Sequence, residues 1–143
     1  MILADVNVLV YSAHVESSRH TEYREWLLSV LAGPEGLALT TATVAGFCRV
    51  VTHPSVFRVP STPADAVAVV TAWDSVRRTR WIDQGGSVWA VLAGLMSADP
   101  GIRGNLVPDA VLAATAIAHR AQLATADRGF ARFPGLRIVH PLG

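Results

Sequence analysis

Three aspartates lie beside the runs that this chain is expected to bury in a sheet. Asp5 follows the apolar residues 2–4, and Asp127 follows a second strand-like run at residues 123–125. Asp109 opens the alanine-rich stretch that leads into that second run. A charge at the end of a buried strand is costly unless hydrogen bonds or a cation compensate it. Because ligands bind at the carboxyl ends of strands in open α/β sheets, we expect the three carboxylates to gather at one sheet edge.

Carboxylates gathered in this way repel one another unless a divalent cation neutralises them. Oxygen-only ligands favour Mg²⁺, with Mn²⁺ as the alternative. Such a centre activates water and stabilises charge during phosphodiester cleavage, so the three aspartates predict a catalytic metal site. The five histidines show no metal-ligand spacing and are expected at the surface or as caps. The single cysteine, Cys48, excludes an internal disulfide and a thiolate zinc cluster.

The composition describes one compact domain over residues 1–143. The apolar fraction of 51% and the charged fraction of 16% exclude a disordered chain. The net charge of +1 predicts no strong nonspecific binding of nucleic acid, so any positive surface must be local. Arg128, adjacent to Asp127, is a candidate RNA contact or a partner in a structural ion pair. No apolar run approaches the roughly 18 residues that span a bilayer, and no signal peptide is recognisable, so we expect a cytoplasmic protein with no membrane contact.

Short strand-like runs alternate with longer helical patterns, which is typical of an α/β fold with a small, mostly parallel sheet flanked by helices. We expect strands at residues 2–4, 37–40, 80–82, 123–125 and 136–139. We expect helices at residues 7–13, 19–31, 44–52, 63–78, 88–96 and 108–120, with a turn at 83–87 and a long loop at 97–105. Asn7, Ser18 and Thr43 are the predicted N-caps of the first three helices.

Three segments of the chain resemble PIN-domain proteins, in particular the VapC-type toxins of bacterial VapBC toxin–antitoxin modules. They are ILADVNVLVYSA, LTTATVAGFCRVVTHP and GNLVPDAVLAATAIAHRAQLATADRGFARFPGLRIVHPL. The resemblance implies a three-layer sandwich in which four acidic residues bind Mg²⁺ or Mn²⁺ and RNA is cleaved. By the match of motifs, Asp5, Asp109 and Asp127 stand at three of the acidic positions, and Asn7 and Thr125 at the polar positions that accompany them.

The same resemblance implies partners. A VapC-type toxin is expected to form a homodimer and to bind a VapB-like antitoxin, which lays an extended or helical segment into a groove and blocks the site. The substrate that the resemblance implies is RNA.

Gly46 is where the chain departs from the family pattern, which places a glutamate immediately before the aromatic residue, here Phe47. Glycine inside a helix costs about 1 kcal/mol relative to alanine, and nothing local calls for a positive φ. A glutamate three residues after Thr43 would also complete a capping box. We interpret Gly46 as the replacement of a functional acid, by natural divergence or by an introduced change. Its loss is expected to impair turnover but to leave the fold and partner binding intact.

Other interpretations remain open at this stage. Gly46 favours a binding module that engages RNA or an antitoxin without cutting. A metal-dependent phosphatase is a weaker alternative, because Asn7 occupies the second place of the Asp-x-Asp pair that nucleophilic phosphatases use. Asp109 could be only a helix N-terminal acid, and Asp127 only a turn residue.

Overall fold

One parallel sheet forms the centre of the computed structural model, which describes residues 1–82 and 85–143. Within these ranges five strands run in the order β3-β2-β1-β4-β5, and each neighbouring pair is parallel. The strands are β1 (Ile2–Ala4), β2 (Leu37–Leu39), β3 (Arg80–Trp81), β4 (Gln122–Ala124) and β5 (Arg137–Val139). The predicted strands are confirmed to within one residue at each end.

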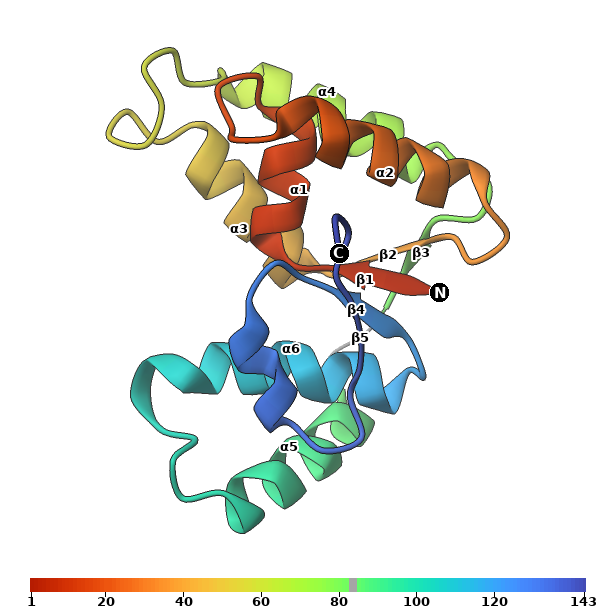
Figure 1. The fold of residues 1–143 in the computed structure, drawn as a ribbon, viewed down its shortest axis with the longest axis vertical. Helices are drawn as coiled ribbons and strands as arrows, with labels where there is room; N and C mark the ends of the chain where they lie inside the picture. Colours follow the sequence, from red (N-terminus) through yellow and green to blue (C-terminus); the bar gives the residue numbers. More distant parts are fainter. Residues whose placement is uncertain (83–84) are drawn as a thin grey trace.

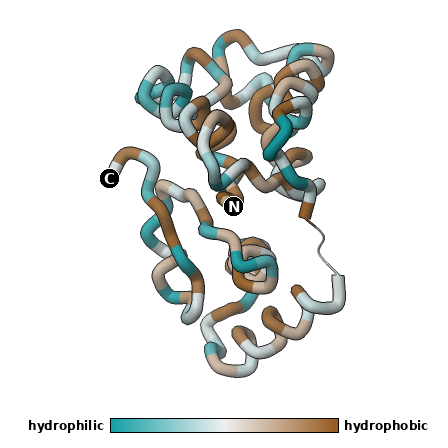
Figure 2. The backbone as a smooth tube through the Cα atoms, turned by 90° about the vertical axis from the view of Figure 1, so that its right-hand side faces the viewer, coloured by the Kyte–Doolittle hydropathy of each residue, from teal (hydrophilic) through white to brown (hydrophobic). Residues whose placement is uncertain are grey.

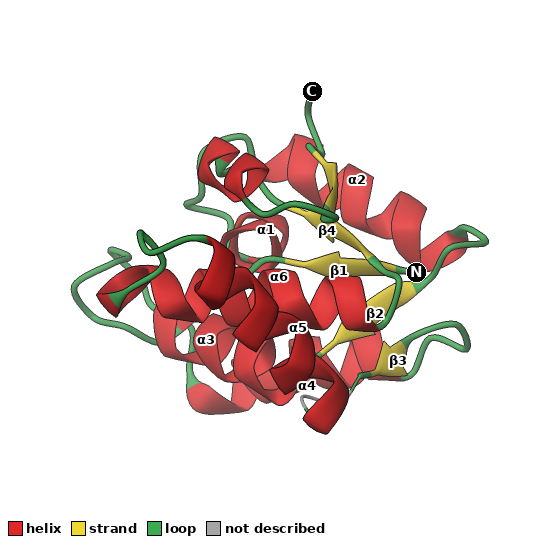
Figure 3. Cartoon of the chain, turned by 90° about the horizontal axis from the view of Figure 1, so that it is seen from below, coloured by secondary structure: helices red, strands yellow, loops and turns green. Residues whose placement is uncertain are grey.

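Helices cover both faces of this sheet (Figure 1). They are α1 (Val6–Ala13), α2 (His20–Ala32), α3 (Thr41–Val51), α4 (Pro63–Asp74), α5 (Gly86–Ala98) and α6 (Val107–Ala118), with 3₁₀ turns η1 (Gly104–Leu106) and η2 (Arg128–Arg132). The first four helices lie on one face, and α5 and α6 on the other. Figure 2 shows the two helical groups from the side, and Figure 3 shows the strands β4, β1, β2 and β3 side by side from below. The α/β three-layer sandwich is confirmed.

Alternation along the strands divides the buried residues into two cores. Leu3 packs with α5 and α6, whereas the next residue, Ala4, packs with the helices of the other face. Successive side chains of a strand point to opposite faces, so a strand covered on both sides is apolar throughout. This explains why the central strands are continuous apolar runs that end abruptly in a polar residue.

The predicted caps of the first two helices are wrong. Helix α1 begins at Val6 directly after β1, with Asp5 at the N-cap position, so Asn7 lies exposed inside the first turn and caps nothing. Helix α2 begins at His20, two residues after Ser18, and its N-cap is Arg19 in the left-handed region at φ 55°. In both cases the tertiary position of the chain, and not a local side-chain cap, sets where the helix starts.

The predicted cap of α3 is also wrong by one turn. The helix begins at Thr41 because Thr40 is the N-cap, and Thr43 completes a capping box with it. The Thr43 backbone N–H donates to Thr40 Oγ1 at 3.0 Å, and the Thr40 N–H donates to Thr43 Oγ1 at 3.2 Å. Gly46 therefore lies in the second turn of α3, and a capping box between residues 43 and 46 is excluded.

Two further expectations need correction. The helix predicted over 63–78 ends at Asp74. The loop predicted over 97–105 is shorter, because α5 extends to Ala98 and η1 begins at Gly104. Of the turn predicted over 83–87, residues 83 and 84 lie outside the described residues. In the described ranges, no helix has the length and apolar character to span a membrane.

Candidate active site

Asp5 lies at the carboxyl end of the central strand, where β1 turns directly into α1. Its backbone N–H donates to the Ala124 carbonyl at 2.9 Å, which anchors the residue to the neighbouring strand β4. The hydroxyl of Thr125, a fully buried side chain, donates to Asp5 Oδ2 at 2.9 Å. Burial raises the pKa of Asp5 above its ordinary value of 3.8, although the hydrogen bond from Thr125 acts in the opposite direction.

Asp109 faces the same cavity as Asp5 from the opposite helical layer. It lies in the first turn of α6 after Pro108, which occupies a position where a helix needs no backbone donor. Burial raises the pKa of Asp109, and the charges of Asp5 and Asp127 raise it further. The cavity has a volume of about 260 Å³. Its remaining lining residues are Val6, Ala42, Thr43, Pro108, Val111 and Leu112.

Asp127 lies on the other side of Thr125 from Asp5. Its backbone N–H donates to Thr125 Oγ1 at 3.0 Å, and its Oδ1 accepts from the Gly129 N–H at 2.7 Å. The side chain thus caps η2, which is the turn role that the sequence left open. Its charge still raises the pKa of both Asp5 and Asp109. The structure therefore brings Asp5 and Asp109 into one cavity, and Asp127 acts on them through its charge.

Comparison with known proteins decides the family. The PIN domain family model matches residues 2–136. The chain belongs to the PIN-domain family. Ribonuclease VapC43 of Mycobacterium tuberculosis (strain ATCC 25618 / H37Rv) is 40% identical over 142 residues, which cover 99% of this chain and 96% of that protein.

Solved structures show the same PIN fold. VapBC2 from Rickettsia felis, bound to a DNA fragment from its promoter, matches with a TM-score of 0.70 at 22% identity, over 97% of this chain and 98% of that chain. FitAcB from Neisseria gonorrhoeae matches with a TM-score of 0.68 at 25% identity, over 99% of both chains.

Gly46 has a packing reason in this PIN domain that the sequence did not reveal. A Cβ atom at Gly46 would lie 2.8 Å from Cγ2 of Val6, a separation too short for real Cβ contacts. Ala42 and Thr43, which precede Gly46 by four and three residues on the same helical face, line the cavity that holds Asp5. A side chain at position 46 would therefore point toward that cavity, past Val6.

The PIN-domain carboxylates fit a hard divalent cation in part. Within residues 1–82 and 85–143, no group of three or more His, Cys, Asp or Glu side chains lies close enough to hold a metal ion. Asp5 and Asp109 nevertheless supply two carboxylates to one cavity, and no ion pair of the described residues includes either. Mg²⁺ commonly uses only one or two carboxylates together with water and substrate phosphate oxygens. The two carboxylates therefore suit Mg²⁺, whose other ligands would be water and substrate oxygens.

The other predicted site residues differ in where the structure places them. Thr125 lies where a supporting residue should, between Asp5 and Asp127. Asn7 is exposed and does not line the cavity. Arg128 is exposed, and no ion pair among the described residues includes it, which leaves its RNA-contact interpretation in place. In contrast, Arg132 pairs with Asp99 at 2.8 Å.

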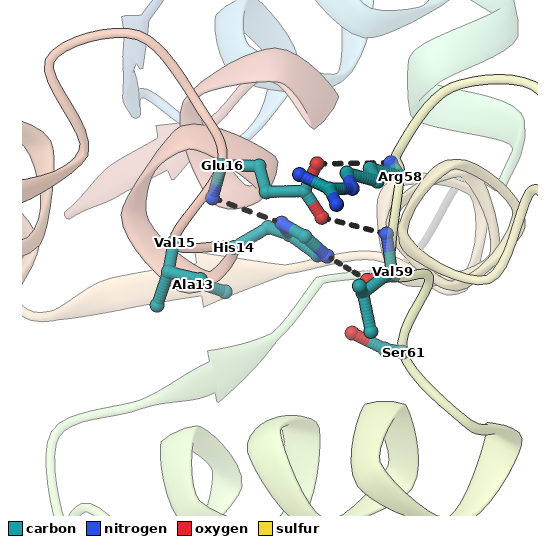
Figure 4. Close-up of a pocket in the computed structure, with 7 residues that line it drawn as sticks. All are labelled: Ala13, His14, Val15, Glu16, Arg58, Val59 and Ser61. Carbon is teal, nitrogen blue, oxygen red and sulfur yellow. Dashed lines mark hydrogen bonds between the residues drawn. The ribbon is translucent and has the colours of Figure 1, made fainter.

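A second cavity, of about 550 Å³, reveals a residue pair that the sequence did not single out (Figure 4). His14, expected at the surface, is only 6% exposed and stacks on Phe57 with ring centroids 3.6 Å apart. Glu16 accepts hydrogen bonds from the backbone N–H groups of Arg58 and Val59 at 2.9 and 2.8 Å. Together they fasten the connection between α3 and α4 to the end of α1. The partners are more than forty residues away in sequence, so no local pattern marks them.

Proposed function

We propose that this chain is a metal-dependent endoribonuclease and the toxin of a type II toxin–antitoxin module. One observation carries the proposal: Asp5 and Asp109 face one cavity at the carboxyl edge of the sheet, and burial raises the pKa of both. A bound cation would compensate two half-buried carboxylates that have no cationic side chain as an ion-pair partner among the described residues. The PIN-domain relatives named ribonuclease VapC43 and ribonuclease VapC25 point to RNA as the substrate.

Each site residue has a defined task in this proposal. Asp5 and Asp109 hold Mg²⁺ or Mn²⁺, with Asp127 adding negative charge from across Thr125. Thr125 fixes the orientation of the Asp5 carboxylate, because its hydroxyl donates to Oδ2. The cation, when bound, supplies an activated water and offsets charge on the leaving oxygen. Val6 and Leu112 supply apolar parts of the cavity wall.

The partners follow from the complexes among the solved relatives. VapBC2 and FitAcB support a VapB-like antitoxin as the partner of this chain. An apolar cavity of about 350 Å³ along α2 and α4, with Leu28 47% exposed and Arg24 in its lining, offers a seat for an apolar antitoxin segment. We place the protein in the cytoplasm, because RNA and the antitoxin are found there.

A homodimer is the remaining partner in this proposal. Helix α5 has no charged residue over Gly86–Ala98, and Trp89 is 64% exposed on it. Figure 2 draws this outer helix largely in white and brown, the middle and the hydrophobic end of the hydropathy scale. Such an uncharged outer face is typical of an interface between copies of a chain.

The second candidate is a PIN-domain module that binds RNA or antitoxin without cutting. Gly46 favours it, because position 46, one helical turn beyond the cavity-lining residues Ala42 and Thr43, carries no acid. Cleavage of RNA by the purified chain separates the two candidates. The nuclease requires cleavage that Mg²⁺ or Mn²⁺ supports and a chelator stops, whereas the binding module retains RNA and leaves it uncut.

A further inference from the structure

A small cavity with basic lining residues lies beside His140, whose ring contacts the Thr125 carbonyl. It has a volume of about 110 Å³, and its lining includes Arg19, Arg128 and His140. That volume holds roughly four water molecules, since each occupies about 30 Å³ in the liquid. The three basic residues come from three separate parts of the chain: the start of α2, the start of η2 and the residue after β5.

Arg19 is held in an unusual backbone conformation at the rim of this cavity. Its φ of 55° and ψ of 31° lie in the left-handed region, which residues other than glycine rarely adopt. Glu22 fixes the guanidinium from one edge, since Nε and Nη2 donate to its two carboxylate oxygens at 3.0 and 2.6 Å. The Nη1 edge makes none of these bonds and is the edge left for a further acceptor.

His140 is linked to Asp5 through Thr125. Its Nδ1 contacts the Thr125 carbonyl at 2.8 Å, and a carbonyl only accepts, so the hydrogen is on Nδ1. Thr125 in turn donates its hydroxyl to Asp5. Thr125 therefore links His140, in the lining of the basic cavity, to Asp5, in the lining of the acidic cavity.

The guanidinium groups of Arg19 and Arg128 are the donors that this cavity offers to an anion. Arg128 is exposed beside it, and no ion pair among the described residues involves that guanidinium. Glu22 is the acidic partner of Arg19, and the terminal residue Gly143 also belongs to the lining. The ion pairs of the described residues include none between the chain terminus and either arginine, so both guanidinium groups keep donors for a ligand.

We infer that Arg19, Arg128 and His140 form a subsite for a backbone phosphate of the RNA strand, next to the phosphate that is cut. This inference rests on the proposed ribonuclease function and adds a positioning role to it. Arginine forks suit phosphate oxygens, and a contact to a neighbouring phosphate would fix the register of the strand over Asp5 without reading its bases.

The test is the binding of a short fluorescent single-stranded RNA, measured by anisotropy with a chelator present so that it is not cut. Wild type is compared with Arg19→Asn, Arg128→Gln and Arg120→Asn over a series of salt concentrations. Asparagine tolerates the left-handed region, so Arg19→Asn removes the charge with little backbone cost. Arg120 is the matched control, because its φ of 56° is equally left-handed and it lies at the opposite end of β4.

The subsite predicts that Arg19→Asn and Arg128→Gln each weaken binding several-fold for every RNA sequence. Each should also reduce the slope of log K against log salt by about 0.7, the value for one phosphate contact on a single strand. Arg120→Asn should bind as wild type does. Wild-type affinity and slope in Arg19→Asn, while wild type itself binds and cuts RNA, would overturn the subsite alone.

Two further outcomes concern the source of the phosphate and the function. If inorganic phosphate stabilises wild type but not Arg19→Asn against heat, and RNA binding is equal in both, the cavity takes free phosphate and the RNA subsite is wrong. If wild type neither binds nor cuts any RNA while it binds Mn²⁺, the subsite and the ribonuclease function are both overturned.

Discussion

Val6 would have to shift to admit any side chain at position 46, because a Cβ on residue 46 would lie 2.8 Å from Val6 Cγ2. Val6 is the first residue of α1, directly after Asp5, so this contact joins two helices at the edge of the acidic cavity. The side chain of Val6 thus occupies the space beside Gly46. Restoring an acid at position 46 requires room at position 6.

The first prediction concerns this pair. Gly46→Glu alone should lower the melting temperature and leave cleavage no faster, because the new Cβ displaces Val6. Val6→Ala with Gly46→Glu should cut RNA at least about tenfold faster than wild type, since an added carboxylate completes the metal shell. Val6→Ala with Gly46→Gln is the uncharged control. A folded Val6→Ala/Gly46→Glu variant with wild-type turnover would show that the missing carboxylate does not limit the rate.

The second prediction concerns stability and pH. The folded-state pKa values of Asp5 and Asp109 lie above their ordinary 3.8, so the folded protein holds these protons more tightly than the unfolded chain does. Ionisation of these two carboxyl groups therefore lowers the free energy of unfolding. Their contribution to stability is fully present below pH 3.8 and is lost as the pH rises through the folded-state pKa values. Asp5→Asn should raise the melting temperature at pH 7 and flatten its pH dependence, measured by thermal unfolding in chelator. An unchanged pH profile would contradict the burial of this charge.

The third prediction concerns Thr125, whose hydroxyl donates to Asp5 and accepts from the Asp127 N–H. Thr125→Val keeps the shape and removes both bonds, which should cost about 1–3 kcal/mol of unfolding free energy. Cleavage should fall by roughly 10–100-fold, as for the loss of a residue that orients a metal ligand. Thr125→Ser keeps the hydroxyl and should retain most of the activity. Equal cleavage rates in the two variants would show that the Thr125 hydroxyl does not orient Asp5 for catalysis.

The fourth prediction concerns the fastening of the α3–α4 connection. Hydrogen bonds from the Val59 and Arg58 backbone hold the pKa of Glu16 below its ordinary value of 4.5. The stability they contribute is present above pH 4.5 and is lost as the pH falls through the lower folded-state pKa. Glu16→Gln should speed hydrogen exchange at the Arg58 and Val59 amides several-fold at neutral pH. Glu25→Gln, an exposed glutamate on α2, serves as the control, and equal exchange in both variants would contradict the fastening.

The sequence predicted the fold and the strand ends well, because both depend on local patterns. Asp5 and Thr125 follow apolar runs that are buried on both faces, so their place at the sheet edge could be foreseen. The helix starts were less predictable. Asn7 has the chemistry of a cap, but the direct transition from β1 to α1 puts it two residues past the N-cap position, which Asp5 occupies.

Long-range contacts explain what could not be predicted. The packing of Val6 against position 46 could not be predicted, because Val6 lies forty residues away in the chain. The stacking of His14 on Phe57 is equally remote in sequence. Asp127 has both a turn role and an electrostatic role. Its carboxylate caps η2 and also raises the pKa of Asp5 and Asp109.

The most direct test of the account is RNA cleavage by the purified chain and by Asp109→Asn, each in Mg²⁺, in Mn²⁺ and in chelator. The account predicts that wild type cuts RNA with either metal, stops in chelator and recovers when metal is returned, while Asp109→Asn is slower by roughly 100-fold or more. Cutting that persists in chelator would contradict it. So would intact RNA with wild type and with Val6→Ala/Gly46→Glu when both are folded and bind Mn²⁺.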